Sequence, residues 1–227
     1  MGVDLKDRPS PNHGPRRGNG PVDILLLHYT GMPTAAAALD RLCDPAAEVS
    51  AHYLIEEDGT IWRLVDEARR AWHAGESVWA GERDVNSRSI GIELANPGHG
   101  PDYRVFPDAQ MDALAALGRE ILARHPVPSH RVLGHSDVAP GRKRDPGELF
   151  DWRLLSERGI GLWSDASVPA AECADPAALM RRFGYRDASA AAIAAFQLHF
   201  RPTNVTGIAD PETLARLADL AERAGLA

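Results

Sequence analysis

The chain has 227 residues, of which 44% are hydrophobic and 25% are charged, so it has an ordinary globular composition and is long enough to bury a core. Its 25 Lys and Arg residues are outnumbered by 32 Asp and Glu residues, which gives a formal net charge of −7. This balance argues against a nucleic-acid-binding protein, which would carry a basic surplus or stripe. No apolar run approaches the roughly 18 residues of a membrane helix, so we predict no membrane segment.

The first third of the chain contains two strand signals and one helix signal. Residues 1–20 are rich in Pro, Gly, Asn and Arg, and we expect them to form an extended arm and no packed element. Residues 22–30 are almost continuously apolar, which is typical of a buried central strand. Thr34 precedes an alanine-rich stretch and predicts a capped helix up to residue 43. Residues 51–65 form two strand-like runs around Asp58-Gly59, which predicts a hairpin.

The middle of the chain alternates between strand and helix patterns. Residues 89–96 and 131–135 indicate strands. Residues 107–125 carry apolar side chains at helical spacing between two prolines, and residues 151–159 predict a short helix that ends at glycine. The order of these elements predicts an α/β fold with a mixed central β-sheet flanked by helices.

The composition changes after residue 163, which indicates a second domain. We expect residues 21–163 to form the larger domain and residues 164–174, which are small, polar and Pro-containing, to form a linker. Residues 175–227 contain three helical patterns, two of which start with Asp-Pro at Asp175 and Asp210. They predict a small three-helix bundle, which is either a binding module or a bundle that stabilises the larger domain by packing.

Histidine is the residue type that first points to chemistry. The chain has nine, and His28 stands out because it ends the most apolar strand, where α/β sheets usually place their sites. The alternative is a hydrogen-bonded core histidine. Six others are assigned to the arm, to loops or to the C-terminal helices: His13, His73, His99, His125, His130 and His199.

A second group of candidate residues lies in the Gly- and Pro-rich segment 134–147, which we expect to be a loop. With His28, its His135 and one of its two aspartates would complete a set of two imidazoles and one carboxylate, typical of a catalytic zinc site with an open fourth position. Spacing alone leaves open whether Asp137 or Asp145 is the ligand; the other could hold a histidine tautomer. The segment could also be a plain surface turn.

Glu93 is the third candidate. It alternates with Ile92 and Leu94 and shares its strand face with the small residues Gly91 and Ala95, which would leave room for a ligand. A carboxylate near a metal-activated water is a ready general base. The alternative is a strand residue that faces solvent.

Four segments together resemble a known family, the zinc-dependent N-acetylmuramoyl-L-alanine amidases of the amidase-2 type, in particular its bacterial anhydromuropeptide and murein amidases. The resemblance covers roughly residues 20–160. It implies a mixed sheet flanked by helices, in agreement with the pattern above. The segments that carry it are HYT at 28–30, SAHYLIEEDG at 50–59, AWHAGESVWAGERDVNSRSIGIELAN at 71–96 and GHSDVAPGRKRDPGELFDW at 134–152.

The resemblance also implies the roles of individual residues. It places the Zn²⁺ ligands on His28, His135 and Asp145, and so leaves Asp137 a structural role. It places the catalytic glutamate on Glu93. In that role Glu93 would take the proton of the attacking water and pass it to the departing amine of L-Ala.

Lys143 matches the family's lysine and would stabilise the oxyanion of the tetrahedral intermediate together with zinc. The sequence departs from the pattern of phage and recognition-protein relatives, which have a tyrosine where this chain has Ala51. His52 and Trp72-His73 match positions near the family's groove, without an implied chemical step.

The implied substrates are peptidoglycan or anhydromuropeptide fragments, and the bond cleaved joins muramic acid to L-Ala. Residues 176–220 resemble a three-helix peptidoglycan-binding module. The alternative function is a non-catalytic peptidoglycan-recognition protein, whose relatives lose a zinc ligand. A zinc peptidase is disfavoured because the HExxH helix is missing from the sequence. The sequence leaves open the oligomeric state and the choice between intact murein and soluble fragments.

The expected compartment is the cytoplasm, where an amidase would act on imported wall fragments. The sequence starts without an apolar signal segment, and Cys43 and Cys173 are expected to be reduced thiols. The alternative is the periplasm or cell envelope, for a chain from which a leader has been removed.

Overall fold

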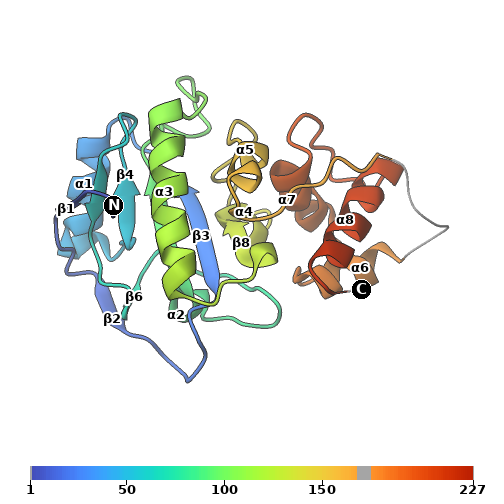
Figure 1. The fold of residues 1–227 in the computed structure, drawn as a ribbon, viewed down its shortest axis with the longest axis horizontal. Coiled ribbons are helices and arrows are strands. Elements are labelled where there is room, and N and C mark those ends of the chain that lie inside the picture. The colour runs from blue at the N-terminus through green and yellow to red at the C-terminus, as the bar shows by residue number, and fades with distance from the viewer. Residues whose placement is uncertain (1, 168–174, 227) are drawn as a thin grey trace.

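The computed structural model describes residues 2–167 and 175–226. Figure 1 shows a larger part that contains the sheet and a helical C-terminal part beside it. The predicted linker 164–174 therefore lies largely outside the described residues, as does Cys173. None of the helices in the described residues has the length and apolar character needed to cross a membrane.

A six-stranded sheet forms the centre of the larger part. Only β4 and β5 are antiparallel, as the hairpin around Asp58-Gly59, and the other neighbouring strands are parallel. The predicted mixed sheet is therefore confirmed. In spatial order the strands are β1 (Leu5–Asp7), β5 (Ile61–Arg63), β4 (Tyr53–Ile55), β7 (Ser89–Leu94), β3 (Ile24–Tyr29) and β8 (Val132–Gly134).

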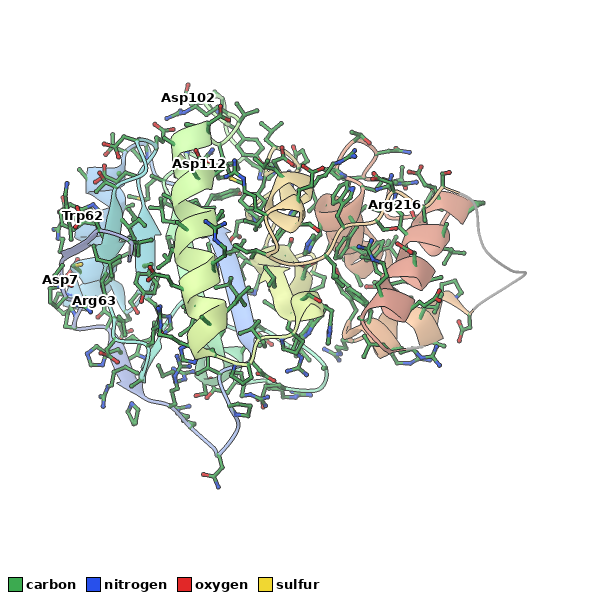
Figure 2. The ribbon with its side chains drawn as sticks, in the orientation of Figure 1. Asp7, Trp62, Arg63, Asp102, Asp112 and Arg216 are labelled. Atoms are coloured by element: carbon green, nitrogen blue, oxygen red, sulfur yellow. The ribbon has the colours of Figure 1, made fainter. Side chains whose placement is uncertain are left out.

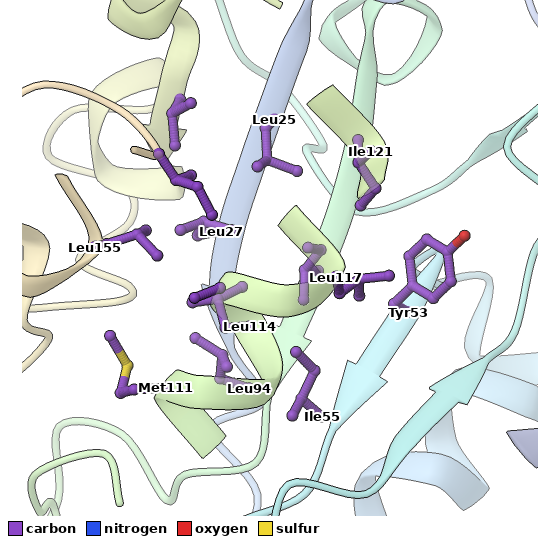
Figure 3. Packing of buried hydrophobic residues seen from close by; sticks show 14 of the residues in the cluster. Leu25, Leu27, Tyr53, Ile55, Leu94, Met111, Leu114, Leu117, Ile121 and Leu155 are labelled. Atoms are coloured by element: carbon purple, nitrogen blue, oxygen red, sulfur yellow. The ribbon is translucent and has the colours of Figure 1, made fainter. Parts of the chain in front are cut away.

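Helix α3 (Asp108–Arg124) covers one face of the sheet, as Figure 1 shows. It begins after Pro107, as its sequence predicts. Leu114 and Leu117 of this helix belong to the same buried cluster as Leu25 and Leu27 of β3, and all four are labelled in Figure 3. The short helix α5 (Trp152–Glu157) adds Trp152 and Leu155 to the same cluster, so this face of the sheet belongs to the main hydrophobic core.

The opposite face of the sheet carries two separate hydrophobic clusters. Leu54 packs with helix α1 (Ala35–Cys43), which Thr34 caps as predicted. Ile24 and Leu26 pack with the C-terminal helices. The polar side chains of β3 and β7 lie on this same face, because strand residues alternate between faces.

The N-terminal arm differs from the sequence prediction. Residues 1–20 contain two paired strands, β1 and β2 (His13–Pro15); β2 pairs with the unpredicted β6 (Arg69–Ala71). The guanidinium of Arg16 donates to the backbone carbonyls of four residues, Glu67, Asn86, Ser87 and Ser89. The low strand propensity of the arm is thus overridden by pairing with existing edges and by these bonds.

Three short elements join the predicted ones. They are η1 (Pro45–Ala47), α2 (Val85–Arg88) and η2 (Ser129–Arg131). The segment predicted as the 134–147 loop begins with one helical turn, α4 (His135–Val138), which is a partial correction of that prediction.

The C-terminal part contains the three predicted helices, α6 (Pro176–Phe183), α7 (Ala190–Phe200) and α8 (Pro211–Arg223). They share one hydrophobic cluster with Ile24, Leu26, Leu133 and Val138 of the larger part. Arg216 of α8, labelled in Figure 2, donates to the carbonyl of Ser164 at 2.8 Å. This part therefore packs closely against the sheet-containing part.

Candidate metal centre and catalytic cleft

The candidate site lies where β3 and β7 end on the face opposite α3. His28 of β3 and Glu93 of β7 are register partners in this parallel pair, so both side chains project from one face. His135 follows β8 directly, at the start of α4. Adjacent parallel strands thus bring together residues that are 42 to 107 positions apart in sequence.

His28, His135 and Asp145 meet around one point. The Nδ1 atoms of the two histidines are 2.9 Å apart, and each lies 3.0 Å from Oδ2 of Asp145. All three residues are buried. Two nitrogens and one oxygen converging in this way could hold a metal ion, and these are the three residues that the family resemblance implies as ligands.

The hydrogen bonds behind His135 leave its Nδ1 lone pair directed at this point. Nε2 of His135 lies 3.0 Å from the carbonyl oxygen of Ala74. Arg142 Nη2 is farther from that nitrogen, at 3.4 Å, and donates instead to the carbonyls of Ala74 and Glu76. Nε2 therefore carries the proton and donates it to Ala74, and Nδ1 is free to bind a cation.

His73 fixes the tautomer of His28 in the same way. Ser89 Oγ donates its only proton to the carbonyl of Val85 at 2.7 Å, so it accepts from His73 Nε2 at 3.3 Å. His73 Nδ1 is then an acceptor, and His28 Nε2 donates to it at 3.0 Å. Nδ1 of His28 consequently presents a lone pair to His135 and Asp145.

Burial and neighbouring charges favour metal-binding protonation states. Burial, and next the adjacent His135, lower the pKa of His28 to about 4, so its imidazole is neutral at pH 7. Burial alone would raise the pKa of Asp145, but His135 and His28 outweigh it and hold this pKa well below its usual value. A neutral imidazole and an ionised carboxylate are the forms that bind a metal.

Glu93 lies in the cleft and does not face bulk solvent. Burial, and next the charge of Asp145, raise the pKa of Glu93 well above its usual value, while Lys143 acts in the opposite direction. Within the described residues its Oε2 is buried and has no hydrogen-bond partner. A buried carboxylate oxygen without a protein partner is suited to a water or substrate group in the cleft.

The cleft beside these residues has a volume of about 440 Å³. Helix α1 contributes Ala38, Arg41 and Leu42 to the wall of this cleft, and Lys143 also lines it. Its further lining residues are Tyr29, Thr30, Gly31, Met32, Val49, Ser50, Trp72, His73, Glu93, His135, Arg142, Arg144 and Asp145. The structure thus brings all five sequence-predicted site residues to one place, since His28 contacts His73, His135 and Asp145.

Asp137 has a different role from the one considered at first. Its carboxylate contacts neither His28 nor His135, and it accepts instead from Tyr185 and His199 of the C-terminal part. The suggestion that Asp137 holds a ligand's tautomer is therefore wrong. His73 and the carbonyl of Ala74 do so.

His73 and His199, which the sequence pattern assigns to a loop and to the C-terminal helices, contact His28 and Asp137. His73 contacts His28, and its ring fills the space above Gly91, so the room expected over that glycine is occupied by the protein itself. His199 is buried against Asp137. His52 accepts from the backbone N–H of Gly91 and does not line the cleft. The only sequence signal for His73 was its place beside the family's groove.

Comparison with known protein families gives two matches along the chain. Residues 18–148 match the Amidase_2 family model, described as N-acetylmuramoyl-L-alanine amidase. Residues 184–217 match a model described as putative peptidoglycan binding domain. The first match covers more than half of the chain and contains every residue of the candidate site.

Individual relatives agree with the family match. The N-acetylmuramoyl-L-alanine amidase AmiD of Escherichia coli is 38% identical over 90% of this chain and 84% of its own length. Its structure in complex with the substrate anhydro-N-acetylmuramic acid-L-Ala-D-γ-Glu-L-Lys covers 97% of this chain and 94% of that chain, with a TM-score of 0.80 and 36% identity.

Two further proteins are similar to this chain. AMPDH3 of Pseudomonas aeruginosa, solved in complex with anhydromuramic pentapeptide, is 35% identical, with a TM-score of 0.78 and 95% of each chain covered. The 1,6-anhydro-N-acetylmuramyl-L-alanine amidase AmpD of Enterobacter cloacae is 35% identical over 66% of this chain and 87% of its own length. The chain thus belongs to the Amidase_2 family of N-acetylmuramoyl-L-alanine amidases and carries a C-terminal domain of the putative peptidoglycan-binding type.

Proposed function

We propose that this protein is a zinc hydrolase that cleaves the amide bond between N-acetylmuramic acid, or its 1,6-anhydro form, and L-Ala of the stem peptide. The observation that carries the proposal is the meeting of His28, His135 and Asp145 at a cleft that Glu93 also lines, where Glu93 Oε2 has no hydrogen-bond partner among the described residues. The complexes of AmiD with its substrate and of AMPDH3 with anhydromuramic pentapeptide support the substrate class.

The chemistry of the three donors supports zinc as the metal. Two lone pairs that face each other across 2.9 Å repel unless a cation or a proton lies between them, and burial disfavours the protonated imidazole. Bonds of about 2.0–2.1 Å in tetrahedral directions would separate the donors by roughly 3.3 Å, close to the 2.9–3.0 Å found. Two imidazoles, one carboxylate and an open fourth position are typical of catalytic zinc.

When bound, zinc would supply the Lewis acidity that polarises the substrate carbonyl and makes a water molecule acidic enough to react near neutral pH. Glu93 would accept the proton of that water as it attacks, because its Oε2 has no partner in the part of the chain that the structure describes, and its raised pKa makes it a stronger base than an ordinary carboxylate. The same oxygen would then return the proton to the departing amine of L-Ala.

Lys143 would stabilise the oxyanion that develops on the carbonyl oxygen, since it lies in the wall of the cleft near Asp145 and Glu93. Arg41, Arg142 and Arg144 add positive charge to the same cleft. A cationic cleft suits the stem peptide, which carries free carboxylates.

The experiment uses purified full-length protein and 1,6-anhydro-N-acetylmuramyl-L-Ala-D-γ-Glu-L-Lys, with products identified by mass spectrometry. We expect release of the free peptide, loss of activity with a chelator and recovery with Zn²⁺. His28→Ala should remove metal and activity. His13→Ala, outside the cleft, is the matched control.

Two outcomes would contradict this function. Binding of the fragment without release of peptide would favour the non-catalytic recognition protein. Full activity of His28→Ala in the presence of chelator would exclude the proposed metal chemistry. Parallel assays on purified sacculi would show whether intact murein is also a substrate.

The compartment stays a prediction. We propose a cytoplasmic role on wall turnover fragments, with the periplasm or envelope as the alternative. Fractionation of cells that express the untagged gene tests it: recovery in the envelope or periplasm would contradict the cytoplasmic assignment and leave the proposed chemistry unaffected.

A further inference from the structure

A buried carboxylate, Asp137, joins the C-terminal helices to the segment that carries a candidate metal ligand. Its Oδ1 accepts from the Tyr185 hydroxyl at 2.5 Å, and its Oδ2 accepts from His199 Nδ1 at 2.8 Å. Oδ2 also accepts from the backbone N–H of Gly134 at 2.8 Å. The side chain of Asp137 is 0% exposed, so its oxygens are satisfied by these donors and not by bulk water.

The backbone around Asp137 presents two of the three candidate ligands. The bond from Gly134 N–H closes the turn α4, whose first residue is His135. The next residue, Ser136, donates from its backbone N–H to the carbonyl of Asp145 at 3.0 Å. A shift of Asp137 would therefore move His135 directly and Asp145 through this bond.

The two side-chain donors to Asp137 are held in single orientations. The ring of Tyr185 packs edge-on against Trp79, with ring centres 4.9 Å apart. The His199 ring is stacked between Trp152 at 3.6 Å and Phe200 at 3.8 Å. These ring contacts restrain both donors, so together the donors define the position of the Asp137 carboxylate.

We propose that the C-terminal helices position the metal centre: Tyr185 and His199 are positioning residues that hold Asp137, and Asp137 holds the turn that presents His135. This inference rests on the proposed function, because it assumes a metal between His28, His135 and Asp145. It assigns the C-terminal domain a role inside the enzyme that requires no contact with glycan.

The role predicts a specific effect on metal affinity. Loss of one donor leaves the buried carboxylate short of a partner, and it must turn to find another, which displaces His135. Partners behind metal ligands typically contribute about 10–100-fold to metal affinity. We expect a loss of that size for Tyr185→Phe, which removes one hydroxyl, and for His199→Phe, which keeps the stacking and removes the donor.

The experiment measures the zinc dissociation constant of the full-length protein by competition with a chromogenic chelator, and the visible spectrum of the Co²⁺-loaded form. His199→Asn is the rescue variant, since its amide can donate from near the position of Nδ1. Gln197→Leu is the matched control: Gln197 is buried in the same helix, and all the partners of its side chain among the described residues belong to the C-terminal part.

We expect Tyr185→Phe and His199→Phe to weaken zinc binding and alter the Co²⁺ spectrum, His199→Asn to recover most of the affinity, and Gln197→Leu to lower the Tm of the metal-free protein with little change in zinc affinity. Wild-type zinc affinity in both donor variants would overturn the inference. An equal loss in Gln197→Leu would also overturn it, because general destabilisation would then suffice. A wild-type protein that binds no zinc would instead refute the proposed function.

Discussion

Gly91 offers a way to test the role of His73 without removing any polar group. This glycine lies on β7 between Ile90 and Ile92, and the ring of His73 covers it. A Cβ atom at position 91 would lie 2.6 Å from three atoms of that ring. Gly91→Ala therefore places a methyl group where the imidazole must be in order to accept from His28.

The size of the displacement follows from this distance. Ordinary van der Waals contact begins near 3.4 Å, so the ring must retreat by about 0.8 Å. The bond from His28 Nε2 to His73 Nδ1 is 3.0 Å long, so a retreat with only about 0.3 Å directed away from His28 takes it beyond the usual hydrogen-bond range of about 2.7–3.2 Å. We expect zinc affinity to fall by about 10–100-fold and the free energy of unfolding to fall by about 1–3 kcal/mol.

The assay compares the zinc dissociation constant, the Tm of the metal-free protein and kcat/KM on the anhydromuramyl tripeptide. Gly14→Ala is the matched control, because a Cβ there would meet nothing within 4 Å and would slightly restrict the unfolded chain. His73→Asn provides a second background, in which the ring that collides with the methyl group is gone. In that background Gly91→Ala should cause little further loss of zinc affinity or of Tm.

Two results would refute this reasoning. Gly91→Ala with wild-type zinc affinity would show that the position of His73 does not matter to His28. Equal effects of Gly91→Ala in the wild-type and His73→Asn backgrounds would show that the methyl group acts elsewhere, since residues in contact should give non-additive changes.

Three further predictions follow from the same structure. Lys143→Met should lower kcat by about 10²–10³-fold with a small change in KM, and an unchanged kcat would exclude its oxyanion role. Burial alone would raise the pKa of Glu67, but bonds from Arg124, Tyr53 and His125 lower it to about 2. Glu67 thus adds at most about 3 kcal/mol to the free energy of unfolding, and this contribution is complete above pH ~4.5 and is lost as the pH falls toward ~2. In Glu67→Gln the free energy of unfolding, measured with urea, should therefore change less between these two pH values than in the wild type. The same pH dependence in both proteins would contradict this. Zinc at 100 times its dissociation constant should stabilise the protein by about 2.7 kcal/mol and raise Tm by roughly 5–11 °C, whereas an equal Tm with and without metal would argue against the site.

The elements that the sequence predicts well are those with strong local signals. The apolar run of β3, the Asp58-Gly59 hairpin and the Pro-started helix α3 each carry their own pattern of hydrophobicity and turn residues. His28 and Glu93 could be singled out for the same reason, as polar residues in strands that are otherwise apolar.

The parts that the sequence does not predict depend on contacts between distant segments. The bond between His199 and Asp137 spans 62 residues, and the strands of the N-terminal arm exist because other edges are available for pairing. The position of His73 over Gly91 likewise depends on how the segment after β6 folds back onto β7. Periodicity describes which face a side chain takes and does not describe what packs upon that face.

Residues from both ends of the chain form hydrogen bonds that orient the candidate metal ligands. From the N-terminal arm, Arg16 donates to the backbone carbonyl of Ser89, whose hydroxyl accepts from His73, the partner of His28. From the C-terminal helices, His199 reaches the turn of His135 through Asp137. The two imidazoles are thus oriented by opposite ends of the sequence, whereas a metal ion requires both lone pairs at a single point. Mutations in the N-terminal arm or the C-terminal helices should therefore lower activity by weakening zinc binding. The zinc dissociation constant is thus a more direct measure of their effect than the turnover rate.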